Sequence, residues 1–283
     1  MARPLYINEP FGVDLKESIY ALDTTTINLC LSLFPWAPFR LTKAAVKLHT
    51  LLDLRSNIPV FIHISDGRLH EVNILDQLVP ELGAFYVMDR GFRDVEPLYR
   101  FHEAGSFFVT RGKSNLKVQR RYSHPVVRAT GLICDQTVVF TDFNSHKGFE
   151  ARLRRIRLKD PATGKTLIFL TNNVTLPAFT IPERDQCRWQ IELFLKWIKQ
   201  HLRVKDFFDT SENVVKSQIW IAVSVYVLVA IVKKRLNLST TLYEIRQIVN
   251  LTMFERIPLD QLLAQAVREN TDPISDKQLI LFE

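Results

Sequence analysis

Three apolar runs open this sequence, and alternating helical and strand-like segments follow them. The three runs are rich in β-branched residues or alternate apolar with polar residues, which is typical of strands. Two segments with helical spacing come next, each followed by a short apolar run. This order predicts an α/β fold in which a mixed sheet carries helices on its faces. The predicted strands are 20–29, 44–54, 59–64, 84–88 and 106–110, and the predicted helices are 72–82 and 95–104.

The composition is that of an ordinary folded protein in a reducing compartment. Hydrophobic residues make up 47% and charged residues 24% of the 283 residues. The three cysteines, Cys30, Cys134 and Cys187, are far apart and odd in number, which fits neither a disulfide framework nor a zinc site. The longest apolar run, 219–232, is shorter than the roughly 20 residues of a membrane-spanning helix, so we expect a buried helix there.

Positive charge is concentrated in one central segment. Residues 111–183 contain 13 Lys and Arg but 5 Asp and Glu, whereas the rest of the chain has 24 basic and 25 acidic residues. A solvated surface explains many charge runs, but an asymmetry across the whole chain favours a surface for a polyanion. A turn at 160–164 also predicts a hairpin with Arg155, Arg157 and Lys159 on one face. We interpret the segment as an all-β insertion with one cationic face.

Two aspartates stand where a sheet of this kind places its sites. Asp23 lies within the first apolar strand, where a carboxylate is costly to bury unless it is paired, hydrogen-bonded or bound to a metal. Asp89 ends another strand, and the carboxyl ends of strands are common positions for sites in α/β folds. Taken alone, either residue is also explained as a turn or cap residue.

A polar stripe follows the first of the helices predicted near the end of the chain. Arg188 and Glu192 are about 40° apart around an ideal helix, and Lys199 lies about 20° from Glu192. Spacing alone favours an amphipathic helix with an i,i+4 ion pair, which stabilises a helix by about 0.2–0.5 kcal/mol. The three predicted helices are 184–204, 214–236 and 241–251.

The polar stripe resembles the signature of insertion-sequence-four type transposases, Y-x2-R-x3-E-x6-K. Arg188, Glu192 and Lys199 match the R, E and K of that signature. Earlier in the chain, four more segments match one branch of the family in the right order: YALD at 20–23, LSLFPWA at 31–37, KLHTLLD at 47–53 and YVMDRG at 86–91. The resemblance covers essentially the whole chain.

The resemblance implies a ribonuclease-H-like fold with a catalytic D-D-E triad. Asp23 would be the first acid, Asp89 the second and Glu192 the third, with a β-rich insertion between the last two. Three converging carboxylates repel one another unless cations neutralise them, and oxygen ligands suit two Mg²⁺ or Mn²⁺ ions. Two such ions support in-line phosphoryl transfer. The implied activity is cleavage and strand transfer of DNA at transposon ends.

The resemblance also implies partners and an organisation of the chain. Double-stranded DNA would be bound at terminal inverted repeats and at the target, with Arg188 and Lys199 positioning phosphates, and a homodimer would act on paired ends. The compartment would be the bacterial cytoplasm, since the N-terminus has no secretory signal. We divide the chain into the first part of the catalytic domain (1–110), the basic β-rich insertion (111–183), and the catalytic helix with a helical C-terminal region (184–283).

Three features depart from the family pattern. Asp185 occupies the position of the signature tyrosine, where a carboxylate would repel the DNA backbone or add to the acidic cluster. The base-stacking tryptophan of the family's insertion has no counterpart within 111–183, so a Phe or Tyr would have to substitute. The N-terminal DNA-recognition region of full-length relatives is expected to be missing.

Two other functions fit parts of the sequence. A catalytically weak or inactive remnant, which binds DNA or dimerises without cutting, is favoured by Asp185 and by the expected lack of the recognition region. A hydrolase with paired carboxylates that acts on other substrates is a weaker alternative, because the positive charge of 111–183 argues against it.

Overall fold

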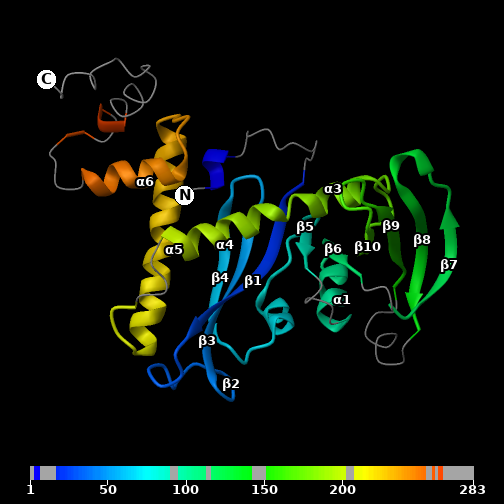
Figure 1. The fold of residues 1–283 in the computed structure, drawn as a ribbon. Coiled ribbons are helices and arrows are strands. Elements are labelled where there is room, and N and C mark those ends of the chain that lie inside the picture. Colours follow the sequence, from blue (N-terminus) through cyan, green and yellow to red (C-terminus); the bar gives the residue numbers. More distant parts are fainter. Residues whose placement is uncertain are drawn as a thin grey trace, which may run out of the picture.

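The computed structural model describes residues 3–6, 17–89, 95–112, 116–141, 151–201, 207–252, 257–258 and 261–263, and its strands form one ten-stranded sheet (Figure 1). The strands are β1 (Ile19–Leu29), β2 (Pro38–Arg40), β3 (Lys43–Asp53), β4 (Ile58–Asp66), β5 (Phe85–Met88), β6 (Phe107–Arg111), β7 (Val118–His124), β8 (Leu132–Phe140), β9 (Leu153–Lys159) and β10 (Thr166–Thr171). The helices are α1 (Val95–Glu103), α3 (Thr180–Gln186), α4 (Trp189–His201), α5 (Glu212–Arg235) and α6 (Leu242–Leu251). Short 3₁₀ helices are η1 (Arg3–Tyr6), η2 (Glu71–Gln77) and η3 (Arg128–Thr130).

The first half of the sheet has a mixed topology. β1 pairs antiparallel with β3, which in turn pairs antiparallel with β4. On its other side β1 pairs parallel with β5, and β5 pairs parallel with β6. The spatial order β4-β3-β1-β5-β6 therefore combines three antiparallel strands with two parallel ones. This confirms the ribonuclease-H-like mixed sheet expected from the sequence.

The basic segment continues the same sheet. β10 pairs antiparallel with β6 and with β9, and β8 and β7 follow at the far end. The predicted hairpin is present: the N–H of Asp160 donates to the carbonyl of Lys165 at 2.9 Å, and Gly164 adopts a φ of 68°, which suits glycine. β7 was not predicted, because its sequence VQRRYSH lacks an apolar alternation.

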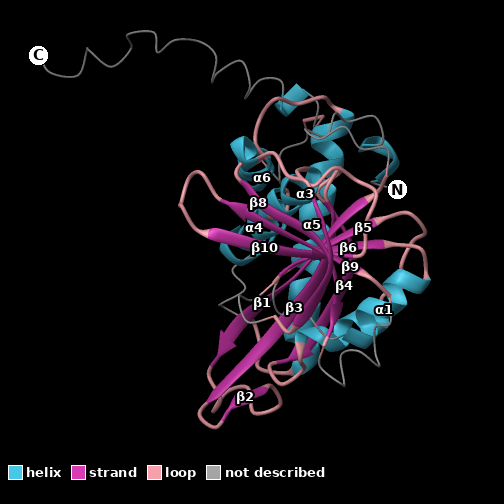
Figure 2. Cartoon of the chain, turned by 90° about the vertical axis from the view of Figure 1, so that its right-hand side faces the viewer, coloured by secondary structure: helices cyan, strands magenta, loops and turns pink. Residues whose placement is uncertain are grey.

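Alternation along β1 divides the core between the two faces of the sheet. Ile19 and Ala21 belong to the cluster that includes the buried residues of α4, whereas Tyr20 and Leu22 pack with η2 and α1. Figure 2 shows α1 and α4 on opposite sides of the strands. The helices therefore cover both faces, as the alternating pattern predicted.

The prediction of one helix over 184–204 is wrong in one respect: the structure divides this region into α3 and α4. The N–H of Cys187 donates to the carbonyl of Arg184 at 3.2 Å, and the N–H of Arg188 donates to that of Asp185 at 3.1 Å. Such i→i−3 bonds form a tight 3₁₀ turn. Arg184 and Asp185 are 1% and 2% exposed, so tertiary contacts hold the residues that precede the turn.

The helix predicted over 72–82 is shorter than expected and differs in type. The structure places the 3₁₀ helix η2 at Glu71–Gln77, and the chain becomes extended at Leu78, whose ψ is 140°. Pro80 follows two residues later and cannot donate the backbone hydrogen bond that a continuing helix would need. The 3–4 spacing of apolar residues therefore continues past the end of the element that it predicted.

The apolar run 219–232 lies in α5 and is buried over part of its surface. Trp220, Ile221 and Leu228 are exposed, at 48%, 64% and 60%. By length and composition alone α5 would suit a membrane span, but 44% of its most apolar 18-residue window is buried inside the protein. Its buried residues are Val215, Ile219, Ala222, Val223, Tyr226, Val229 and Ala230.

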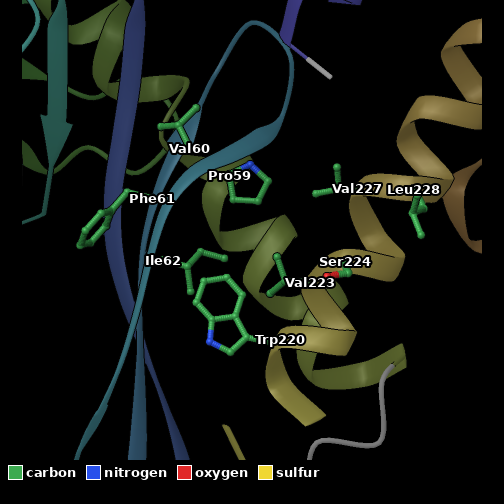
Figure 3. A pocket seen from close by; sticks show the side chains of 9 residues that line it. All are labelled: Pro59, Val60, Phe61, Ile62, Trp220, Val223, Ser224, Val227 and Leu228. Atoms are coloured by element: carbon green, nitrogen blue, oxygen red, sulfur yellow. The ribbon is translucent and has the colours of Figure 1, made fainter. Parts of the chain in front are cut away.

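An apolar groove of about 450 Å³ separates β4 from α5. Side chains of the strand and of the helix face each other across it (Figure 3). Deeper in the same contact, the hydroxyl of Tyr226 donates to the carbonyl of Asn57 at 3.0 Å, which fixes α5 to the turn before β4. The groove is lined by Pro59, Val60, Phe61, Ile62, Trp220, Val223, Ser224, Val227 and Leu228.

Candidate active site

Asp23 lies on β1, and Asp89 directly follows the neighbouring parallel strand β5. Leu22 of β1 pairs with Met88 of β5. The residues that follow them, Asp23 and Asp89, are therefore neighbours across the two strands. Two residues earlier, Ala21 belongs to the core cluster under α4, and the period of two turns Asp23 toward the same face. The register of the sheet therefore brings two of the predicted acids together.

Glu192 reaches the same place from α4, and Arg188 connects it to the strands. Arg188 lies in the turn between α3 and α4, and its side chain is 12% exposed. The Nη2 atom of Arg188 is 2.8 Å from Oε1 of Glu192, and its Nη1 atom is 3.7 Å from Oδ2 of Asp23. One guanidinium thus bridges the carboxylates that the resemblance assigns as first and third acids.

The surroundings of Asp23 disfavour its charged form. Burial raises the pKa of Asp23 to about 6. The N–H of Thr24, which donates to Oδ1 at 2.7 Å, and the guanidinium of Arg188 oppose this increase. The like charges of Asp89 and Glu192 add to it. Asp23 is therefore a carboxylate that lacks sufficient positive charge around it.

Arg188 is the point at which the negative charges of the site converge. Burial lowers the pKa of Arg188, but the attraction of nearby carboxylates outweighs burial, so that this pKa is raised. In decreasing order of effect, the carboxylates are those of Asp89, Asp185, Glu192 and Asp23. All three predicted acids therefore act on one guanidinium, although they come from different elements.

The donor set suits a hard divalent cation, but its present geometry does not form a cage. Within the described part of the chain, no three His, Cys, Asp or Glu side chains converge closely enough to hold an ion. Asp23, Asp89 and Glu192 nevertheless offer only carboxylate oxygens, which Mg²⁺ and Mn²⁺ prefer. Burial is the main cause of the raised pKa of Asp23, and repulsion from Asp89 and Glu192 adds to it; a bound cation relieves that repulsion. The residues therefore fit the implied metal chemically.

Asp185 is buried and paired with an arginine. It is 2% exposed, and its Oδ2 accepts from Nε of Arg111 at 2.8 Å and lies 2.7 Å from Nη2. Burial raises the pKa of Asp185, and Arg111 opposes that increase. Of the two effects expected for this substitution, the structure supports addition to the acidic cluster, with Arg111 as a counter-charge. Arg111 lies 74 residues earlier in the sequence, and no local pattern signals the pairing.

Lys199 lies further along α4 and is exposed. Glu192 is 55% exposed on the same helix, so the solvent-facing stripe continues beyond the turn that divides α3 from α4. The structure thus places all five predicted site residues within or beside β1, β5 and α4. Their roles in metal and DNA binding stay predictions.

The basic insertion presents a cationic surface, but not every arginine contributes to it. Arg155 and Arg157 are half-buried on the face opposite Ile156, as the alternation predicted. Arg154 instead points inward and pairs with Asp135, and these two side chains are 7% and 4% exposed. Among the described residues of the insertion, the exposed cations are Lys117, Arg120, Arg121, Arg128, Arg152, Lys159 and Lys165.

Two aromatic side chains are exposed among the described residues of the insertion. Tyr122 on β7 is 60% exposed and Phe179 is 42% exposed. The register of β7 shifts between Arg120 and Tyr122, and such a bulge redirects side chains. A tyrosine therefore stands among exposed arginines in the segment that has no tryptophan.

Comparison with known proteins identifies the family. The family model described as "Transposase DDE domain" matches residues 14–228. A protein of Sinorhizobium fredii named as a transposase is 33% identical over 245 residues, covering 85% of this chain and 68% of its own length. This chain belongs to the DDE transposase family.

Two further relatives of this transposase chain are named after insertion sequence elements. The transposase for element IS5377 of Geobacillus stearothermophilus is 30% identical and covers 79% of this chain and 60% of its own length. That for element IS4SA of Synechocystis sp. is 26% identical, covering 84% and 67% respectively. The chain therefore spans 60–68% of the length of these curated relatives.

A solved structure shows a weaker likeness. A cryo-EM structure of the piggyBac transposase synaptic complex with hairpin DNA aligns with a TM-score of 0.48 at 9% identity. The alignment covers 91% of this chain and 55% of the piggyBac chain.

Proposed function

We propose that this chain is the catalytic core of an enzyme that cuts and joins DNA strands at the ends of a mobile element. The observation that carries the proposal is that Arg188 contacts Asp23 and Glu192, while the strand register sets Asp89 beside Asp23, in a member of the DDE transposase family. Acidic side chains from β1, β5 and α4 gather on one face of the sheet, where acids far apart in sequence would act together.

Asp23, Asp89 and Glu192 would hold two Mg²⁺ or Mn²⁺ ions. When bound, such ions activate a water or a 3′-hydroxyl and stabilise the leaving oxygen of an in-line phosphoryl transfer. The chain contributes oxygen ligands, of which Asp23 is largely buried. Its pKa of about 6 leaves this carboxylate mostly ionised above neutral pH and able to bind a cation.

Positive side chains would position double-stranded DNA across the site. Lys199 and Arg188 lie on either side of Glu192 in sequence, and the exposed cations of β7–β10 extend the positive surface. Contacts of this kind fix the register of the duplex and weaken steeply with salt. We further propose that a homodimer acts on paired terminal repeats, in the bacterial cytoplasm where the DNA lies.

The test is cleavage of a supercoiled plasmid that carries the terminal repeats flanking this coding sequence. We expect nicking by the full chain with Mg²⁺ or Mn²⁺, none with EDTA, and none by Asp89→Asn. Asp76→Asn is a matched control, since Asp76 is an exposed aspartate paired with Arg100 on the other face of the sheet. Full cleavage by Asp89→Asn would overturn the assignment of the triad. DNA binding that survives EDTA without cleavage in any metal would instead select a non-cutting remnant.

A further inference from the structure

Two polar atoms next to the carboxylates are buried without a hydrogen-bond partner. Within the described residues, neither Oδ1 of Asp185 nor Nε of Arg188 has such a partner. A buried polar atom without a partner is unfavourable because it has lost its hydrogen bonds to water, and native proteins contain few of them. A carboxylate oxygen and a guanidinium nitrogen are complementary groups, so one contact between them would satisfy both.

Asp185 is fixed, and its free oxygen is left available. Both contacts from Arg111, at 2.7 and 2.8 Å, go to Oδ2. Arg111 therefore anchors the carboxylate without using Oδ1. The exposed fraction of Asp185 is 2%, so water has little access to the remaining oxygen.

The turn between α3 and α4 places the side chain of Arg188 on the same side as that of Asp185. The N–H of Arg188 donates to the carbonyl of Asp185 at 3.1 Å, so the two residues close one 3₁₀ turn. Side chains three residues apart in such a turn lie on the same side. Asp185 is also the second strongest source of attraction on Arg188. A rotation of the Arg188 side chain can therefore exchange its partners without moving either helix.

The partners that Arg188 now holds are two of the three proposed metal ligands. Its Nη1 and Nη2 atoms approach Oδ2 of Asp23 and Oε1 of Glu192. A divalent cation bound by the same oxygens would meet the positive guanidinium at close range. The cation and the guanidinium therefore compete for one set of acceptors.

We propose that Arg188 is a resident counter-cation that holds Asp23 and Glu192 together until divalent ions displace it, and that Asp185, anchored by Arg111, accepts the displaced guanidinium. This inference rests on the proposed function, since it assumes that the carboxylates bind metal. It assigns a role to the aspartate at the signature tyrosine position. Arg188 is a positioning residue in the metal-free state and becomes available to DNA only after it leaves the carboxylates.

The test measures Mn²⁺ and Mg²⁺ affinity by calorimetry on the full chain without DNA. Arg188→Met removes the competitor, and we expect the metal dissociation constant to fall about tenfold. Asp185→Asn weakens the alternative acceptor, and we expect that constant to rise about fivefold. In the Arg188→Met background, Asp185→Asn should have no more than about a twofold effect, because no guanidinium remains to be accepted.

Arg100→Met is the matched control. Arg100 makes an ion pair with Asp76 at 2.8 Å and is 44% exposed, so this change removes an arginine–aspartate pair elsewhere in the molecule. We expect unchanged metal affinity. Equal affinity in Arg188→Met and the wild type overturns the inference, and so does an undiminished effect of Asp185→Asn in the Arg188→Met background.

A measurement on the wild type covers the case in which Arg188→Met does not fold. Side-chain NMR signals of Arg188, assigned from an Arg188→Lys spectrum, should shift as Mg²⁺ is added and should saturate with metal binding. Metal binding without movement of these signals contradicts the inference alone. No divalent binding by the wild type would contradict the proposed function itself, so the two failures are distinguishable.

Discussion

Two arginine–aspartate pairs with buried carboxylates are built differently in this molecule. In the insertion, Nε and Nη2 of Arg154 contact Oδ1 and Oδ2 of Asp135 at 2.8 and 2.7 Å, so the fork uses both oxygens. Beside the carboxylate site, Arg111 directs both contacts to one oxygen of Asp185. The first pair is complete, whereas the second leaves an acceptor unused.

The difference separates a structural pair from one that can change partners. A bidentate pair with all its acceptors satisfied favours one geometry and holds β8 and β9 in register. An incomplete pair retains a local cost, and such costs are commonly found at functional sites. The same two residue types therefore provide rigidity in the insertion and an alternative state near Asp23.

The largest expected effect is on DNA cleavage, and it tests the carboxylate site beside the incomplete Arg111–Asp185 pair. Asp89→Asn removes one of the carboxylates that would share the metal ions, so DNA cleavage should fall on the order of 10⁴-fold. The measurement is single-turnover cleavage at saturating Mg²⁺. Binding of the same DNA in EDTA should be retained within a few-fold, and a parallel loss of binding would point to a folding defect.

The next largest effect is a loss of stability when the complete Arg154–Asp135 pair is broken. Arg154→Met leaves the carboxylate of Asp135 buried without its partner, which should lower the free energy of unfolding by about 3–5 kcal/mol. Urea denaturation followed by circular dichroism measures it. The double variant Arg154→Met/Asp135→Leu should recover most of the loss, because it removes both charges together. If the free energy of unfolding of Arg154→Met were within about 1 kcal/mol of the wild-type value, the Arg154–Asp135 pair would be no more rigid than the Arg111–Asp185 pair.

A third prediction concerns a satisfied histidine next to the site. His49 pairs across the strands with Thr24, and its ring nitrogens lie 2.8 Å from Oγ1 of Thr24 and 2.9 Å from Oγ of Ser65. Burial lowers the pKa of His49 to about 4. The unfolded chain then binds more protons than the native state between pH 6.5 and 4, so stability is lost as the pH falls through that range. The loss should approach about 3 kcal/mol.

Unfolding experiments at pH 7 and pH 4.5 provide the test for His49. His49→Gln retains one donor and one acceptor but does not titrate in this range. Its stability should therefore depend less on pH than that of the wild type. Parallel pH dependences in the two proteins would contradict a neutral, buried His49.

The smallest effect has the opposite sign. Asp23→Asn removes a charge that the folded protein disfavours, since the pKa of Asp23 is raised to about 6 by burial. We expect the variant to be more stable than the wild type by about 1 kcal/mol at pH 7.5 without metal. Saturating Mg²⁺ should stabilise the wild type but not the variant. Destabilisation of the metal-free protein by Asp23→Asn would show that the Arg188 contact outweighs the cost of burial.

Much of the sheet could be predicted because its information is local. Alternation or β-branched runs identified β1, β3, β4, β5 and β6 to within one or two residues at most ends, and Asp160 to Gly164 marked the β9–β10 hairpin. β7 was missed because its charged residues are exposed and follow no apolar period. The turn that splits α3 from α4 was missed because burial of Arg184 and Asp185 sets it, and burial is not visible in spacing.

The candidate site residues could be named from the sequence, but the contacts between them could not. Asp23, Asp89 and Glu192 came from motif positions, and the register of β1 with β5 places the first two together. The link through Arg188 to Asp23 joins residues with no relation in sequence spacing. Arg111 gave no sequence signal as a partner of Asp185 because only the folded sheet brings β6 against α3.

Hydrogen bonding of β10 to both β6 and β9 has a mechanical consequence. Because the cationic strands are hydrogen-bonded into the same sheet as β1 and β5, they cannot move as a separate domain. The distance from their charges to Asp23 and Asp89 is therefore set when the protein folds. A DNA duplex that contacts both regions must bend to match this fixed distance. Easily bent DNA steps should therefore be favoured between the cleaved bond and the outer contacts.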